Sequence, residues 1–311
     1  MRPWPIGSAA LLLALLVVSC SKPDTKETRA ALTPASDAQG AGPKSTIGAS
    51  SNELSCKQQA FAESVDLAEA SGATFLSDET LLLIGDSGTQ GAFVVIDAKS
   101  GEPVRKGKLE LDANASDDIE GVSHMDGKLY AITSSGWIRE WSQEEGAFLL
   151  KRESYALAPL DSRNLVCKSG GAFNCAKNYE GLCLLNSAPA AGACAGFVAA
   201  KATGELICLV VDAKGMLTLD PSRSISVSSA GSLSGCAFDQ SERLWFGNNF
   251  FAANAIGFVE NWQIPEEAVV TSVGNIGLGF AEAIAAGPKG QLVRASDTSG
   301  SPSLLSAYIC R

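Results

Sequence analysis

The strongest constraint on the fold of this chain is a sequence unit that recurs at intervals of about fifty residues. Each copy opens with a polar or acidic turn, followed by a small residue and a short apolar run. The small residues that align the copies are Gly72, Gly121, Gly181, Gly235 and Ala283. A repeat of this length indicates an array of like supersecondary units that bury their apolar faces against one another.

The sequence of each copy predicts four short strands. The second copy shows this best, with the runs EGVSHM, KLYAITSS, WIREWSQ and AFLLKRESYAL separated by the turn residues DG, SG and EEG. Alternating apolar residues between Gly, Asp and Ser turns are typical of antiparallel strands, and the repeats show no capped helical period. The chain is therefore predicted to be all-β, a β-propeller of five blades of four antiparallel strands, with six blades as the alternative.

The last copy ends one strand short of a full blade. The segment 57–67 precedes the first copy and can supply the missing outer strand of the last blade. Closing the ring in this way removes an exposed sheet edge. It also places Cys56 beside Cys310, and we expect a disulfide between them.

The N-terminus has the features of a lipoprotein signal. Arg2 precedes an apolar stretch from Ile6 to Val18 that is too short for a comfortable membrane span. The residues Val17-Val18-Ser19-Cys20 resemble a bacterial lipobox, so Cys20 is expected to be lipidated, with an ordinary signal peptide as the alternative. Ser21 after the cysteine, in place of Asp, favours the outer membrane of the bacterial cell envelope, where acyl chains would anchor the protein.

The chain is thus predicted to have three parts: a signal peptide at 1–19, the lipidated cysteine with a flexible Pro/Gly-containing tether at 20–55, and the propeller at 56–311. The net charge is −10, and the repeats contain no run of Lys or Arg. An acidic surface without basic clusters excludes nucleic acid as an expected partner. The partners that we expect are the membrane, through the lipid anchor, and a protein or small ligand on one propeller face.

The cysteines favour a disulfide framework. Cys20 is one of nine, and the other eight form an even set in an exported chain, although eight cysteines allow many pairings. Besides Cys56 with Cys310, the expected pairs are Cys167 with Cys175, Cys183 with Cys194 and, by elimination, Cys208 with Cys236. A zinc site is not expected, because the chain has no C-x-x-C motif and a single histidine.

The turns that open the copies also suggest a family. The segments DIEGVSHMDGKLYAITSSG, NYEGLCL and FAEAIAAGPKGQLVRASDTSG resemble the blade starts of the SdiA-regulated propeller family and of the esterase-like phytase domain. That resemblance implies a β-propeller of six blades, in which divalent cations, often calcium, are found among some members.

Three glutamates at the blade starts are the candidate metal ligands. In a propeller the first strand of each blade lines the central channel, so Glu120, Glu180 and Glu282 are expected to converge. Converging carboxylates repel unless a cation or donors neutralise them, and oxygen ligands of this kind suit Ca²⁺. Asp86 and Asp297 end second strands and are further candidates. The alternative, which the recurrence of the motif favours, is that each Glu accepts backbone N–H groups at its own turn.

Catalysis finds less support in the sequence, so whether the chain is an enzyme is left open. His124 is the single histidine, and no G-x-S-x-G elbow accompanies it. Phe250 and Phe251 are consecutive aromatics that cannot both face inward, so one of them is expected on a binding face. The expected function is a binding or scaffold module with an unknown ligand. The alternatives are a cation-dependent esterase- or phosphatase-like hydrolase and a structural component of a cell-envelope complex.

Overall fold

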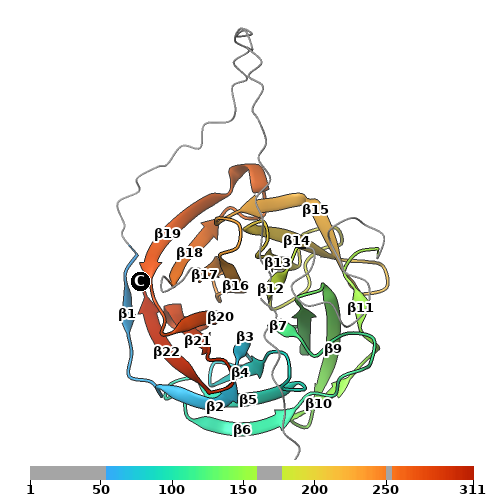
Figure 1. Cartoon of the computed structure of the whole chain (residues 1–311). Coiled ribbons are helices and arrows are strands. Elements are labelled where there is room, and N and C mark those ends of the chain that lie inside the picture. The colour runs from blue at the N-terminus through green and yellow to red at the C-terminus, as the bar shows by residue number, and fades with distance from the viewer. Residues whose placement is uncertain (1–53, 160–176, 250–253) are drawn as a thin grey trace, which may run out of the picture. The chain divides into compact units, whose positions relative to one another are not determined.

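The computed structural model describes residues 54–159, 177–249 and 254–311, and in this part the chain is an all-β propeller (Figure 1). Several predictions concern residues outside the described part: the signal peptide, Cys20 and nearly all of the tether, the pair Cys167 and Cys175, and Phe250 with Phe251. The propeller belongs to one compact unit, Ser50–Arg311.

Five antiparallel sheets form the blades, numbered 1 to 5 by their first strands. Blade 1 contains β3 (Ala70–Phe75), β4 (Thr80–Gly85), β5 (Ala92–Asp97) and β6 (Pro103–Lys108). Blade 2 contains β7 (Ile119–Met125), β8 (Lys128–Thr133) and β9 (Trp137–Glu144), with β10 (Ala147–Leu150) and β11 (Tyr155–Ala156) both paired to β9. Blade 3 contains β12 (Tyr179–Leu184), β13 (Gly196–Ala200), β14 (Glu205–Val211) and β15 (Leu217–Ser226).

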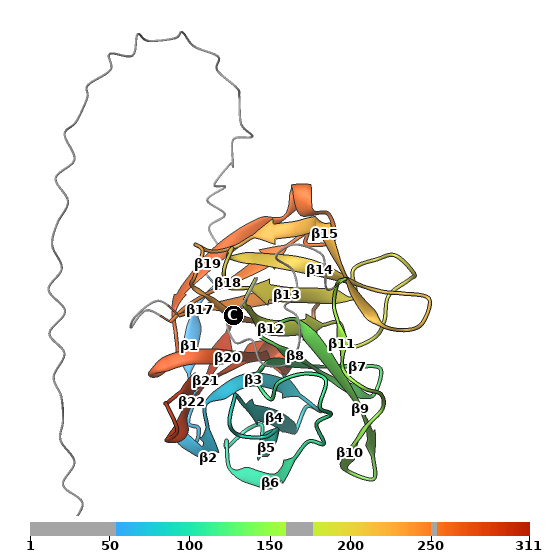
Figure 2. The same ribbon diagram turned by 45° about the vertical axis from the view of Figure 1, so that its right-hand side comes forward.

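Blade 4 contains β16 (Leu233–Phe238), β17 (Leu244–Asn248), β18 (Ala255–Glu260) and β19 (Val269–Asn275). Blade 5 contains β20 (Phe280–Ala286), β21 (Gln291–Asp297) and β22 (Pro302–Cys310). The helices of the described residues are two single 3-10 turns, η1 (Pro265–Glu267) and η2 (Pro288–Gly290), and none is long and apolar enough to cross a bilayer. Figure 2 shows the four strands of blade 3 in succession, from β12 near the middle to β15 at the outside.

The ring closes after five blades. The first strands contact one another in the order β3, β7, β12, β16 and β20, and β20 returns to β3. The prediction of five blades is therefore confirmed, and the six blades implied by the family resemblance are not found in the described chain.

Glycine at the blade starts allows the inner strands to come this close. A Cβ on Gly121 would lie 2.8 Å from the Cα of Gly181, and a Cβ on Gly181 would lie 2.8 Å from the Cα of Gly235. Each glycine thus faces the backbone of the next blade, where a side chain would separate the strands. The small residue that marks the repeat in the sequence is a requirement of this packing.

Hydrophobic clusters fill the five spaces between neighbouring blades. Buried tryptophans occupy three of them: Trp141 lies between blades 1 and 2, Trp262 between blades 3 and 4, and Trp245 between blades 4 and 5. Sheets buried on both faces need continuous apolar runs, which explains why β4 and β13 show little polar alternation.

The N-terminal segment closes the last blade, as expected, but as two strands rather than one. Both β1 (Cys56–Gln58) and β2 (Ser64–Ala68) pair with β22. Cys56 lies opposite Cys310 in the register, and a disulfide joins them. The covalent link connects residues 254 positions apart, so it ties the two ends of the ring together.

The predicted pairing of the remaining described cysteines is wrong. Cys183 is bonded to Cys236, and Cys194 is bonded to Cys208. Cys183 and Cys236 lie on the inner strands of adjacent blades, β12 and β16, so tertiary packing brings them together. Cys194 precedes β13 and meets Cys208 on the neighbouring strand β14. Proximity in sequence suggested a disulfide between Cys183 and Cys194, but the arrangement of the strands brings each of them next to another cysteine.

Candidate metal centre

The candidate site begins with a bulge that every blade repeats. Near the start of each inner strand, the register with the second strand shifts by one residue. The residues at the shift are Ser71, Glu120, Glu180, Ser234 and Glu282, and all five are buried. A bulge leaves its extra residue out of the ladder and redirects the side chain. The repeat therefore presents five equivalent side chains around the channel.

The two serines complete the ring through the backbone. The hydroxyl of Ser71 donates to the carbonyl oxygen of Ile119 at 2.5 Å, and that of Ser234 donates to the carbonyl oxygen of Ala281 at 3.3 Å. In both cases the acceptor directly precedes the glutamate of the next blade. These serines thus connect neighbouring blades.

The glutamates behave differently, and this corrects the interpretation that the sequence favoured. No carboxylate of Glu120, Glu180 or Glu282 accepts a backbone N–H from the described residues. Their polar contacts are to side chains: Asn178 Nδ2 donates to Glu180 at 2.8 Å, and Asn249 Nδ2 donates to Glu282 at 3.2 Å. Among the described residues, the recurring Glu therefore does not fix its own turn by accepting backbone N–H groups.

A second set of equivalent positions lies at the end of the second strand of each blade. In each case it is the residue that follows the partner of the inner-strand residue just before the bulge. The residues are Asp86, Ser134, Lys201, Asn249 and Asp297. Two of them, Asp86 and Asp297, are candidates that the sequence indicated. Lys201 was missed, because the long connection before β13 obscured where the second strand of blade 3 ends. Alignment of the residue after each second strand would have found it.

Lys201 compensates part of the negative charge. Its Nζ lies 3.1 Å from Glu180 Oε2 and 3.8 Å from Glu282 Oε1. Both carboxylates are buried, whereas 21% of the lysine side chain is exposed. One ammonium group therefore bridges the glutamates of blades 3 and 5.

Glu120 is the glutamate of the ring without a direct polar partner in the described chain, and the Lys201 ammonium acts on it only from beyond ion-pair distance. It is 6% exposed, and no described residue forms a hydrogen bond or an ion pair with its carboxylate. It belongs to two clusters in which the ligand oxygens lie within 4.8 Å of one another: one with Glu180 and Glu282, the other with Asp86 and Asp118. Two oxygens that both lie about 2.4 Å from a Ca²⁺ ion are at most about 4.8 Å apart, so either cluster has the dimensions of a one-ion site.

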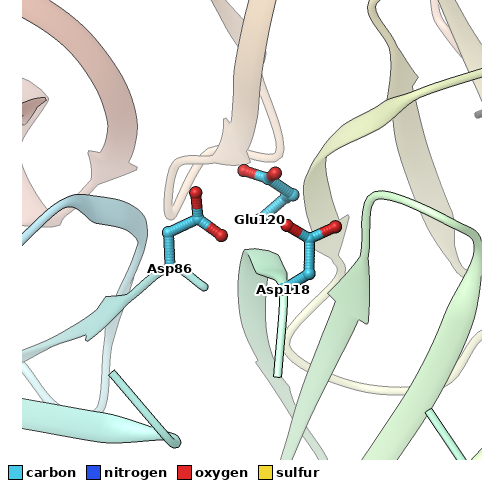
Figure 3. Close-up of side chains that lie close together, drawn as sticks. All are labelled: Asp86, Asp118 and Glu120. Atoms are coloured by element: carbon cyan, nitrogen blue, oxygen red, sulfur yellow. The ribbon is translucent and has the colours of Figure 1, made fainter. Parts of the chain in front are cut away.

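Figure 3 shows the second cluster, in which the carboxyl groups of Asp86, Asp118 and Glu120 face one another. The hydroxyl of Ser134 donates to Asp118, and the backbone N–H of Ser87 donates to Asp86. Asp118 precedes β7 by one residue and was not among the ligands predicted from the sequence. Asp297 belongs to neither cluster and accepts a hydrogen bond from the backbone N–H of Ser299 at 2.8 Å.

Hydrogen bonds outside the cluster hold its two loops together. Asp117 Oδ2 accepts the backbone N–H of Gly88 at 3.1 Å and that of Gln90 at 3.3 Å. The loop that carries Asp86 is thereby tied to the segment that carries Asp118. Because these bonds fix the backbone, the carboxylates remain close despite their mutual repulsion.

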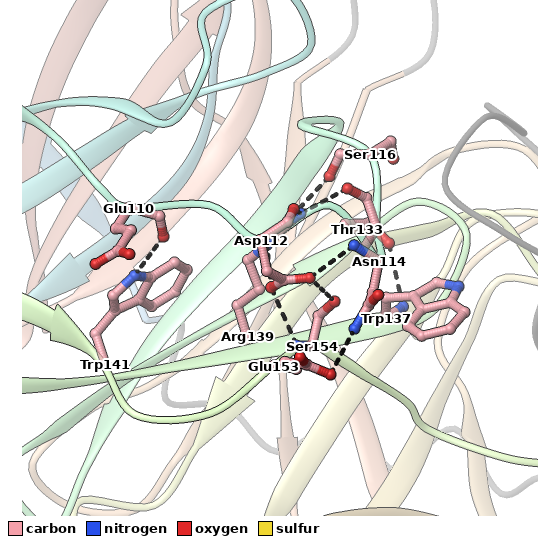
Figure 4. A network of polar contacts seen from close by, with 11 residues as sticks. Glu110, Asp112, Asn114, Ser116, Thr133, Trp137, Arg139, Trp141, Glu153 and Ser154 are labelled. Atoms are coloured by element: carbon pink, nitrogen blue, oxygen red, sulfur yellow. Dashed lines mark hydrogen bonds and ion pairs between the residues drawn. The ribbon is translucent and has the colours of Figure 1, made fainter.

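A buried arginine fixes the segment that leads into β7 (Figure 4). Arg139, 1% exposed, donates at 2.7 Å to the carbonyl oxygens of both Ala115 and Ser116. Asp112 lies 3.5 Å from Arg139 Nε and accepts the hydroxyl of Ser154 at 2.6 Å. Blade 2 thus positions the polypeptide just before Asp117 and Asp118.

The carboxyl groups of the site share an unusual electrostatic environment. Burial raises the pKa of Glu180 to about 7, although Lys201 opposes the shift, and burial with the charge of Glu180 raises the pKa of Glu282 to about 7. Burial also raises the pKa of Asp86 to about 7. The pKa of Glu120 is raised well above its ordinary value by burial and by the carboxylates around it.

His124 lies away from this site. It is near the end of β7, whereas Glu120 is near the beginning, and it lines a separate cavity of about 260 Å³ with Phe75, Asn186 and Phe238. Burial lowers the pKa of His124, which keeps it neutral near pH 7. The histidine therefore takes no part in the carboxylate clusters.

No protein-family model and no curated protein matches the chain. Among solved structures, a glutaminyl cyclase from Myxococcus xanthus gives a TM-score of 0.50 at 14% identity, over 83% of this chain and 98% of that one. A PQQ-bound aldose sugar dehydrogenase from Streptomyces coelicolor gives 0.47 at 12%, over 82% and 98%. The calcium-binding protein regucalcin from Agrobacterium tumefaciens gives 0.43 at 11%, over 81% and 96%. At 14% identity the likeness to the glutaminyl cyclase supports the fold alone, and nothing is inferred from the two matches with lower TM-scores.

Proposed function

We propose that this chain is a divalent-cation-binding β-propeller, exported and anchored to the bacterial envelope through Cys20, that acts as a binding module on the face where its carboxylates gather. The observation that carries the proposal is Glu120, a buried carboxylate that forms no hydrogen bond or ion pair with the described residues, in a site of raised pKa values. Uncompensated buried charge is costly, and a bound cation removes that cost.

The donor set favours a hard cation such as Ca²⁺. All candidate ligands are oxygens, from carboxylates and from the amide of Asn249, whose Oδ1 is buried without a partner. The blade starts also resemble those of the SdiA-regulated and esterase-like phytase families, for which divalent cations are expected. This resemblance, which is carried by the segments that contain the three glutamates, agrees with the chemistry of the site.

The test is calcium binding by the purified chain. Thermal unfolding with and without CaCl₂ is expected to show stabilisation, since an ion that binds only the folded state stabilises it by mass action. Glu120→Gln keeps the size of the side chain and removes its charge, and it is expected to abolish the response. A wild-type chain whose unfolding temperature does not change with calcium would exclude the proposal.

A second candidate function, cation-dependent hydrolysis, is favoured by one observation. Glu180 and Glu282 have pKa values of about 7, which suits carboxyl groups that donate and accept protons near neutral pH. Turnover of p-nitrophenyl acetate and p-nitrophenyl phosphate, with and without CaCl₂, measures this directly. Turnover that Glu180→Gln leaves unaltered would show that another group, or a contaminant, is responsible.

A further inference from the structure

The two carboxylate clusters share Glu120 but differ in their resident charge. The axial cluster, defined as Glu120, Glu180 and Glu282, contains the ammonium group of Lys201. The lateral cluster, defined as Asp86, Asp118 and Glu120, has no ion pair with any described residue. The chain therefore places an ammonium group in direct contact with two carboxylates of the axial cluster, and no described residue makes such a contact in the lateral cluster.

Resting on the proposed cation-binding function, we infer that the divalent ion is held beside the axis by Asp86, Asp118 and Glu120. In the same arrangement Lys201 occupies the axial carboxylates as a built-in cation. The site thus binds one ion, and Lys201 sets that number.

Lys201 excludes a second ion by position and by charge. Its Nζ is within 4 Å of both Glu180 and Glu282, so it uses the oxygens that an axial ion would need. An ammonium group and a divalent ion that share the same carboxylates repel each other strongly in a poorly hydrated site. Glu120 is then free to turn its charge toward the lateral cluster.

The lateral cluster is built to hold its shape when an ion is absent. Ser134 and Ser87 donate to Asp118 and Asp86, which orients the carboxylates from outside as partners of metal ligands commonly do. The bonds from Gly88 and Gln90 to Asp117 fix the two loops. These contacts hold three acids of two adjacent blades close together. The carboxylates repel one another in this position, and a bound cation would relieve that repulsion.

Access to solvent also favours this cluster. Asp118 and Glu120 are buried at 4% and 6% exposure, whereas Asp86 is only partly buried. An ion can therefore enter past Asp86 and reach Glu120, which is buried and unpartnered. A site with one open side and several fixed oxygens suits Ca²⁺, which accepts irregular coordination and bound water.

The experiment is calcium titration of the whole purified chain by calorimetry, with CaCl₂ as the probe. The wild type is expected to bind one ion per chain. Asp118→Asn keeps the acceptor for Ser134 and is expected to weaken binding on the order of 10- to 100-fold. Glu282→Gln, in the axial cluster, is expected to weaken it by at most about threefold, because the ion is not bound there. Asp297→Asn, outside both clusters, is the matched control.

Lys201→Met is the decisive variant. Removal of the ammonium group opens the axial carboxylates, so the stoichiometry is expected to rise from one ion to two, while Lys201→Arg keeps it at one. Since Lys201→Met leaves buried carboxylates without a counter-charge, the double variant Lys201→Met/Glu180→Gln is measured beside it. With one axial charge removed, the double variant is expected to fold and to bind one ion.

The outcomes separate the inference from the proposed function. A wild-type chain that binds no calcium overturns both. One bound ion that Glu282→Gln weakens as much as Asp118→Asn places the ion on the axis and overturns the inference alone. A folded Lys201→Met that still binds a single ion overturns the role of Lys201, and circular dichroism establishes that it is folded.

Discussion

Blade 2 contains two buried glutamates that differ in whether they have a basic partner. Glu140 on β9 is fully buried and lies 2.8 Å from Lys128 Nζ and 3.1 Å from Arg152 Nε. Glu120 on β7 is almost as deeply buried and has no such partner among the described residues. The buried carboxylate of Glu140 within the sheet thus has basic partners, whereas that of Glu120 at the channel has no direct partner in the described part of the chain.

This difference distinguishes a charged group that contributes to stability from one that is available for a ligand. A buried ion pair that has all its partners is tolerated, and the removal of one partner is costly. A buried carboxylate without a partner destabilises the folded state until a ligand neutralises it. The two regions should therefore respond in opposite directions when charge is removed.

The largest effect is expected at Arg139, which, like Glu140, is a buried charged residue of blade 2 with direct partners. Arg139→Leu removes the ion pair with Asp112 and leaves the backbone carbonyls of Asp112, Ala115 and Ser116 without this donor, and the free energy of unfolding should fall by about 3–5 kcal/mol. Urea denaturation measures the change. A loss below about 1 kcal/mol would show that water replaces the guanidinium group and that the network is not structural.

The pH dependence of the calcium-free protein comes next in size. Glu180, Glu282 and Asp86 have pKa values of about 7 in the folded state, above their ordinary values, so the folded chain binds more protons than the unfolded chain between about pH 4 and 7. Stability should therefore be highest below that window and fall through it, on the order of 3 kcal/mol for each group taken alone by pH 8.

Calcium supplies the control for this pH dependence. The ion binds the ionised carboxylates, so CaCl₂ should restore stability at pH 8 and have little effect at pH 5. Urea midpoints at both pH values, with and without CaCl₂, measure the difference. Stability that rises from pH 5 to 8 without calcium would contradict the raised pKa values.

The comparison itself is tested by one substitution at each glutamate. Glu120→Gln removes an uncompensated charge and should stabilise the calcium-free protein by about 1–2 kcal/mol at pH 8. Glu140→Gln breaks two ion pairs and should destabilise it by about 1–2 kcal/mol, a modest loss because Lys128 and Arg152 are partly exposed. Changes of the same sign in both variants would remove the distinction between the two regions.

The smallest effect is expected at an exposed ion pair. Lys106 Nζ lies 2.6 Å from Asp66 Oδ2, but the two side chains are 48% and 84% exposed. Lys106→Met should leave the free energy of unfolding almost unchanged, because water screens the pair. A loss comparable with that of Arg139→Leu would mean that burial does not control the value of these contacts.

Much of the fold was predictable because it depends on local patterns. Recurring small residues such as Gly121 and Gly181 indicate the length of the repeat unit, and the alternating apolar runs between turns indicate the strands. The segment before the first copy was recognised as the closing piece because the last copy lacks a strand. Its division into β1 and β2 was not predictable, since that depends on how the chain passes along β22.

The site was predictable only in part. Glu120, Glu180 and Glu282 were found because they occupy the same place in three copies. Asp118 and Lys201 were missed, because the first lies just outside the repeated strand and the second follows a long loop. Their roles depend on which blades are neighbours, and the sequence of a single blade does not contain that information.

The sequence alone thus determined the repeat, the four-stranded unit, the closing segment and the presence of acids at the blade starts, since each follows from residues close together in the chain. Only the tertiary structure decided the disulfide partners of Cys183 and Cys194, the bulge that turns five side chains toward the channel, and the contact of Lys201 with Glu180 and Glu282. These features arise where separate blades meet, and the distances between blades are set by the packing of the whole ring.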